Sequence, residues 1–188
     1  MKDKDMMKFF FELGHLKILR RSGWALIGIK YPESVAEHMY RAALMGYYLA
    51  KKKGLDAGKV MRMLLIHDIP EARIGDTHKV AARYLDVKEE EKAVTADQAK
   101  LLGEFGKEYI ELMDEYNART TPEAKLAKQI DYLECVMQAR EYMDAGYTHA
   151  KEWLDKTKPK ITDPDCKKIF RHLSDKKAAY WWEGLKKL

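Results

Sequence analysis

The chain has 188 residues, of which 46% are hydrophobic and 35% charged, a balance that fits one globular domain with a sizeable core and argues against a second domain. No run reaches the ~18 apolar residues of a membrane span, and the first residues lack the uninterrupted apolar region of a secretory signal. The formal net charge of +5 resides mostly in lysines at expected helix ends, without the interleaved arginine and aromatic residues of a nucleic-acid surface.

The two cysteines, Cys135 and Cys166, stand in no CxxC or Cys/His metal spacing. They are expected to be buried or free thiols rather than the halves of a disulfide, which suits a reducing compartment. We therefore expect a cytoplasmic protein that spans no membrane and binds no nucleic acid.

The first part of the chain predicts one helix and then an irregular loop. Apolar positions recur with a helical period over residues 5–19. Residues 20–33 have little period of either kind, and two glycines and a proline interrupt them. Arg21 and Trp24 lie in this loop. Taken alone they have a structural interpretation, with Trp24 covering the edge of the core and Arg21 in solvent.

A second helix is marked by a capping box, in which a serine and a glutamate satisfy each other's backbone amides. Ser34 and Glu37 have the required spacing, so the helix is expected to run from Val35 to about residue 52. His38 falls on its apolar face. A single histidine in that position is usually a hydrogen-bonded core residue.

A third helix is expected to begin at Asp56 and to carry an apolar run that ends at His67 and Asp68. Pro70 cannot occupy a helix interior, so a short helical turn over residues 70–74 should start with it. Glu71 is then close to His67. Gly75 permits a sharp turn that allows Asp76 to point back toward the same place.

The second half predicts further helices. One starts after Asp86 and extends to about residue 105, and its Glu89–Glu91 run is interpreted as a solvated first turn. Others are expected over residues 109–116, residues 122–143 and, once or twice, within residues 148–188. Asp131 lies among the apolar positions of the long helix, where an ionised carboxylate is seldom buried unpaired. With no credible strand, the fold is expected to be all-α.

Four polar side chains thus occupy positions that would otherwise be apolar: His38, His67, Asp68 and Asp131. Burying imidazoles and carboxylates together is costly unless something pairs with them, and a divalent cation does so well. Histidine nitrogen and aspartate oxygen form a mixed donor set that suits first-row divalent ions or magnesium. The sequence therefore predicts one metal site between helices.

The order H…HD…D resembles the HD-domain phosphohydrolases, which are named for the adjacent His-Asp pair. The segments ESVAEH, HDIPE, GD and KQID, in that order over residues 33–131, resemble the YfbR-like branch of 5′-deoxynucleotidases and their eukaryotic HD-domain-containing relatives. The resemblance covers roughly residues 5–145. The stretch Arg21-Ser22-Gly23-Trp24 is similar to the R-x-G-W form of eukaryotic and archaeal members, whereas bacterial members have the Arg and Trp adjacent.

The resemblance implies a single HD domain that forms a helical bundle over residues 1–188. It implies hydrolysis of deoxyribonucleoside 5′-monophosphates by one divalent ion, which would be cobalt, manganese, magnesium, nickel or zinc, and a homodimer, in which Trp153, Trp181 and Trp182 offer contact surface. Glu71 would act as general acid or base and Asp76 would hold water or a sugar hydroxyl. Arg21 would grip the phosphate and Trp24 would lie against the sugar.

Three alternatives remain from the sequence. Another HD phosphohydrolase acting on a triphosphate, a cyclic dinucleotide or an alarmone would share the ligands. A non-catalytic metal-binding regulatory module would also keep them, but it would not need Glu71 and Asp76. A nucleic-acid-binding helical protein fits least, and a shallow salt dependence of any nucleic-acid binding would exclude it.

Overall fold

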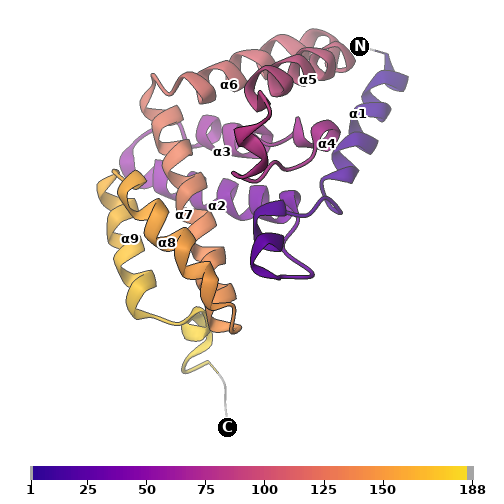
Figure 1. Ribbon diagram of the computed structural model, residues 1–188. Coiled ribbons are helices and arrows are strands. Elements are labelled where there is room, and N and C mark those ends of the chain that lie inside the picture. Colours follow the sequence, from indigo (N-terminus) through magenta and orange to yellow (C-terminus); the bar gives the residue numbers. More distant parts are fainter. Residues whose placement is uncertain (1, 186–188) are drawn as a thin grey trace. The chain divides into compact units, whose positions relative to one another are not determined.

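The computed structural model describes residues 2–185, and these residues form helices without any strand (Figure 1). The expected all-α fold is confirmed. The chain forms two compact units, Met1–Lys128 and Gln129–Leu188. No helix in the described part of the chain is long and apolar enough to cross a membrane.

The first unit consists of helices and short 3-10 turns. In chain order these are α1 (Asp3–His15), η1 (Ser22–Ile27), α2 (Val35–Lys53), α3 (Ala57–Ile66), α4 (Glu71–Ile74), η2 (Ala81–Arg83), α5 (Val87–Leu102), η3 (Gly103–Phe105) and α6 (Gly106–Ala118). Helix α7 (Pro122–Asp144) starts in this unit and continues into the second.

The second unit follows α7 with η4 (Thr148–Ala150), α8 (Lys151–Thr157), η5 (Lys158–Lys160), α9 (Pro164–Asp175) and η6 (Ala178–Trp182). The Gln129 side chain on α7 makes hydrogen bonds to the segment that precedes α9. Its amide donates to the Lys160 carbonyl at 3.0 Å and accepts from the backbone N–H groups of Thr162 and Asp163 at 2.6 and 3.0 Å. Up to residue 185, the α-helices after residue 148 are α8 and α9, which agrees with the one or two helices expected there.

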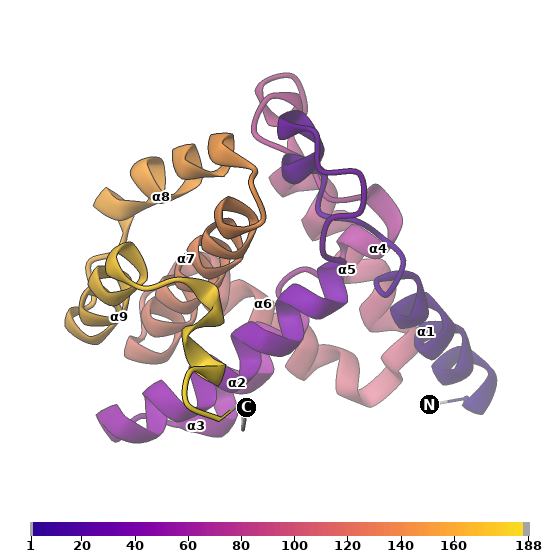
Figure 2. The same cartoon turned by 90° about the horizontal axis from the view of Figure 1, so that it is seen from below.

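Helices α2 and α3 pack side by side and position the candidate site (Figure 2). The predicted capping box is present at the start of α2, and Asp56 caps α3. The close approach needs a residue without a side chain, because a Cβ on Gly46 would overlap the Leu64 side chain. The core of this unit continues from α2 to α1, α5 and α6 through the buried residues Phe9, Leu16, Val35, Met39, Ile69, Ala72, Ala99, Tyr109 and Met113.

The first helix is shorter than predicted, ending at His15 rather than at residue 19. The reason lies in the backbone of the next residues. The carbonyl of Leu16 accepts from the Ala36 amide at 3.1 Å, and that of Leu19 accepts from Val35 at 2.9 Å. These carbonyls accept from the first turn of α2 and so do not accept from a continuing helix. Apolar periodicity does not reveal such hydrogen bonds between segments.

Helix α5 begins at Val87 as predicted, but Asp86 makes no side-chain cap bond. The helix ends at Leu102 rather than near residue 105, because Gly103 has a positive φ of 58° and opens a 3-10 turn. Helix α6 then starts at Gly106, earlier than the expected residue 109.

Candidate metal centre

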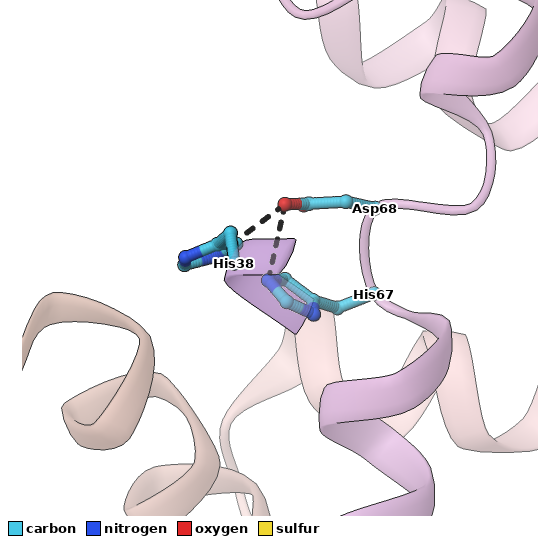
Figure 3. Close-up of side chains that lie close together, drawn as sticks. All are labelled: His38, His67 and Asp68. Carbon is cyan, nitrogen blue, oxygen red and sulfur yellow. Dashed lines mark ion pairs between the residues drawn. The ribbon is translucent and has the colours of Figure 1, made fainter. Parts of the chain in front are cut away.

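His38, His67 and Asp68 converge on one point of the first unit (Figure 3). The Nε2 atoms of His38 and His67 lie 3.7 and 3.2 Å from the same Asp68 carboxylate oxygen, Oδ2. The two imidazole rings meet edge to face with their centroids 5.4 Å apart. Both histidines are buried, and the Asp68 side chain is 17% exposed.

The adjacent residues His67 and Asp68 lie at the end of α3. His67 terminates the helix, and its Nδ1 lies 2.9 Å from the Leu64 carbonyl oxygen. Because a carbonyl can only accept, Nδ1 is the nitrogen that carries the proton, and the lone pair of Nε2 faces Asp68. A ligating histidine is typically fixed in this way by a bond from its other nitrogen.

The three residues fit a divalent cation. One ligand atom from each lies within 4.8 Å of the others, and the set combines imidazole nitrogen with carboxylate oxygen. The carboxylate oxygen would balance part of the cation's charge, and the imidazoles are held in place by the packing of α2 on α3. The close juxtaposition of His38, on one helix, with His67 and Asp68, at the end of another, is what the sequence argument expected.

Asp131, the fourth predicted ligand, lies on α7 at a position within the second unit and is partly buried. The three convergent residues all belong to the first unit. The assignment of Asp131 to the same metal therefore stays a prediction.

Glu71 is the first residue of α4, directly after Pro70, so the predicted break in the helix is present. Its Oε2 atom is buried without a hydrogen-bond partner among the described residues. Burial raises the pKa of Glu71 well above its usual range, and the negative charges of Asp68 and Asp76 raise it further against the opposing charge of Arg21. The protonated form of the Glu71 carboxyl group is therefore favoured in the metal-free protein.

Gly75, directly before Asp76, has a positive φ of 80°, which agrees with the sharp turn expected there. The Asp76 carboxylate accepts a hydrogen bond from the backbone N–H of Ser22, and its backbone carbonyl accepts from the Ser22 hydroxyl at 2.8 Å. Asp76 thus fastens the loop that carries Arg21 and Trp24, a contact that the sequence did not predict.

Arg21 and Trp24 hold different positions within this loop. The Arg21 guanidinium lies 3.4 Å from Asp68 Oδ2, so it reaches the convergent ligands. Trp24 is 1% exposed, and its indole N–H donates to the Glu33 carboxylate at 3.1 Å. The loop interpretation of Arg21 as a solvated residue is therefore wrong, whereas the buried ring of Trp24 agrees with its packing role.

Sequence reasoning missed three residues near the centre. Tyr116 of α6 places its ring 5.2 Å from that of His67, and Glu33 accepts from Trp24. Glu91 is partly buried rather than solvated as expected, and burial together with the Asp68 charge raises its pKa. The available signal was spacing: Glu91, Thr95 and Gln98 share one helix face, and the latter two are buried.

Comparison with known proteins gives a consistent result. A model of the HD domain family matches residues 13–170. The chain is 36% identical over 186 residues to "5′-deoxynucleotidase HDDC2" of Dictyostelium discoideum, covering 91% of this chain and 98% of that protein. The human protein of the same name is 32% identical over 178 residues, covering 90% of this chain and 85% of the relative.

Solved structures share the fold. A predicted metal-dependent phosphohydrolase from Magnetospirillum magnetotacticum superposes with a TM-score of 0.73 at 31% identity, covering 92% of this chain and 90% of that one. The similarity therefore extends over both compact units of the chain, well beyond the convergent residues themselves.

Proposed function

Because the chain belongs to the HD domain family and is a metal-dependent phosphohydrolase, we propose that it hydrolyses deoxyribonucleoside 5′-monophosphates to deoxyribonucleosides and phosphate. The observation that carries this proposal is the convergence of His38 and His67 on the carboxylate of Asp68. The names of the similar proteins support the substrate class.

We propose His38, His67, Asp68 and Asp131 as the residues that hold the divalent ion. When bound, such an ion lowers the pKa of water and neutralises phosphate charge. Cobalt, manganese, magnesium, nickel and zinc all accept nitrogen and oxygen donors of this kind. The hydrogen bond from His67 Nδ1 to Leu64 keeps the ring oriented for this role.

Glu71 is proposed as the group that moves a proton. Burial raises its pKa in the metal-free protein, so it could donate a proton to the departing 5′-oxygen or, once ionised, accept one from water. Asp76 would orient a water molecule or a sugar hydroxyl while its bonds to Ser22 hold the loop.

Arg21 and Trp24 are proposed as the substrate-binding residues. The planar guanidinium of Arg21 suits a phosphate, which it would contact beside Asp68. Trp24 is held rigidly on the adjacent turn. Trp24 is only 1% exposed, so a sugar would meet the small part of the ring that is accessible; a ribose 2′-hydroxyl placed there would lose its water partners without gaining a hydrogen bond, so the deoxy sugar would be favoured.

The chain is further proposed to act as one HD domain and as a homodimer in the cytoplasm. The family match extends from residue 13 to residue 170, which supports a single functional domain. Trp181 is 77% exposed and Trp182 42%, and exposed aromatic surface of this kind is typical of interfaces. Cys135 and Cys166 form no disulfide among the described residues, which accords with a reducing compartment.

The experiment that tests the substrate class compares matched pairs, such as dAMP with AMP, on the metal-loaded protein. We expect kcat/KM to be roughly ten- to a hundredfold higher for the deoxy member, since an unsatisfied hydroxyl costs ~1–3 kcal/mol. Equal values would remove the sugar specificity. Preferred hydrolysis of a triphosphate or a cyclic dinucleotide would replace the proposed substrate with another nucleotide.

A further inference from the structure

Glu33 contacts the proposed substrate loop through both its side chain and its backbone. Its carboxylate oxygen Oε1 accepts from the Trp24 indole N–H at 3.1 Å. Its backbone carbonyl accepts from the Arg21 amide at 3.0 Å. The loop residues proposed to bind the phosphate and the sugar are therefore both attached to this one glutamate.

The same side chain also lies beside a proposed metal ligand. A carboxylate oxygen of Glu33 and a ring nitrogen of His38 are within 4.8 Å of each other. The geometry at the start of α2 explains this proximity. Ser34 is the N-cap of α2, so Glu33 precedes the cap and His38 is the fourth helical residue, two positions whose side chains approach each other across a helix start.

We propose that Glu33 is a positioning residue that fixes the Trp24 ring and the His38 imidazole in one arrangement, and so links sugar selection to metal binding. A carboxylate that accepts the second ring N–H of a ligating imidazole sets the orientation of that ring, and loss of such a partner typically weakens metal binding about ten- to a hundredfold. The hydrogen bond from the Trp24 indole to Glu33 fixes the Trp24 ring. Its acceptor is a charged carboxylate, which makes a stronger bond than a neutral acceptor would. The substrate half of this inference rests on the proposed function, whereas the metal half does not.

Two substitutions at residue 33 separate these roles. Glu33→Leu removes both the acceptor and the charge. Glu33→Gln retains an amide oxygen that accepts from the indole N–H but loses the charge beside His38. Glu37→Gln is the matched control, because glutamine preserves a capping box and Glu37 caps Ser34 rather than contacting Trp24.

The first readout is cobalt affinity, measured by titrating the metal-stripped full-length protein with Co²⁺. We expect the Kd to rise about tenfold or more in both Glu33 variants and to stay at the wild-type value in Glu37→Gln. Wild-type affinity in both Glu33 variants would overturn the link to His38. This readout needs no substrate, so it remains decisive if the nucleotide proposal fails.

The second readout is the ratio of kcat/KM for dAMP and AMP. We expect Glu33→Leu to reduce this ratio several-fold and Glu33→Gln to keep it, since one hydrogen bond of this kind corresponds to about a tenfold effect. An equal reduction in both variants would overturn the role of the acceptor.

Trp24→Phe, which keeps a ring but removes the donor, should reduce the dAMP/AMP ratio as Glu33→Leu does. Trp24→Phe also tests the role of this hydrogen bond if Glu33→Leu does not fold. An unchanged ratio in Trp24→Phe would contradict the inference.

Discussion

The hydroxyl of Ser22 donates to the backbone carbonyl of Asp76 at 2.8 Å, while the Ser22 amide donates to the Asp76 carboxylate. Two segments far apart in the sequence, the loop before α2 and the turn after α4, are therefore joined by a pair of hydrogen bonds. This pair carries Arg21 to within 3.4 Å of Asp68.

Removing the hydroxyl should loosen the loop without touching the metal ligands. For Ser22→Ala we expect KM for dAMP to rise about fivefold, because a single hydrogen bond of ~1 kcal/mol is lost while the backbone bond to Asp76 remains. Asp76→Ala should have a larger effect, since it removes the carboxylate that accepts from the loop. Steady-state kinetics would test this, with Ser22→Thr as the control that keeps a hydroxyl. An unchanged KM in both Ser22→Ala and Asp76→Ala would disprove a positioning role for this contact.

Metal content should depend on the convergent residues. We expect the single variants His67→Ala and Asp68→Ala to lose stoichiometric metal and turnover together, because each removes one donor from a small set. Asp131→Ala should behave in the same way if this residue is the fourth ligand. Elemental analysis after gel filtration measures the bound metal. Full retention in the double variant His67→Ala/Asp68→Ala would refute the assigned site.

Glu71 should affect turnover rather than metal binding. Glu71→Gln is expected to retain the metal and to lower kcat by ~10²–10⁴, the usual contribution of a group that transfers a proton. The amide keeps the size of the side chain but cannot exchange a proton. Paired metal analysis and kcat measurement would check this. A variant with nearly full kcat would exclude Glu71 from the mechanism.

Glu12 provides a pH-dependent contribution to stability away from the site. Arg73 donates two hydrogen bonds to it at 2.7 and 2.9 Å, and Gln98 donates at 2.6 Å, joining α1 to α4 and α5. Burial raises the pKa of Glu12, but the bonds from Arg73 and Gln98 outweigh it, so the pKa lies below its ordinary value of 4.5.

A lowered folded-state pKa stabilises the protein above the unfolded-state value, and this stabilisation is lost as pH falls through the folded-state pKa. Glu12→Gln should therefore reduce the free energy of unfolding by about 1 kcal/mol at pH 7. The difference from wild type should shrink below about pH 4.5. Urea unfolding at several pH values tests this, and a difference that stayed constant across the range would contradict it.

Arg21 and Trp24 should have separable effects. Arg21→Ala is expected to depress kcat/KM for dAMP and AMP alike, because both carry the same phosphate. Trp24→Ala should narrow the ratio between them, mainly by improving the ribonucleotide relative to the deoxyribonucleotide. The kinetic comparison uses both substrates with each variant. A selective loss for one sugar in Arg21→Ala would argue against a phosphate clamp.

The metal ligands could be inferred from sequence because they break an otherwise apolar pattern. His38 on α2 and the His67-Asp68 pair after α3 are polar where helix packing requires burial, and such residues need a partner. Asp131 was found by the same reasoning, but spacing along a chain does not give a distance between helices. For this residue the inference extends only to its place on α7.

Other residues could not be found in this way. Glu91 shares one face of α5 with the buried Thr95 and Gln98, but a polar face gives no apolar period, so only the spacing of these three residues could have indicated it. Glu33 and Ser22 act through contacts between segments that local propensity does not describe. The end of α1 was misplaced for a related reason, since the carbonyls of Leu16 and Leu19 bond to α2 instead of extending their own helix.

The central claim is that the convergent His38, His67 and Asp68 site uses a divalent metal to hydrolyse a deoxyribonucleoside 5′-monophosphate. The most direct test is phosphate release from dAMP by one preparation of the protein, measured after metal removal and again after addition of Co²⁺. We predict no release from the stripped protein, restored release with cobalt, and no restoration in Asp68→Ala. Phosphate release that is equal with and without metal, or absent in both, would contradict the claim.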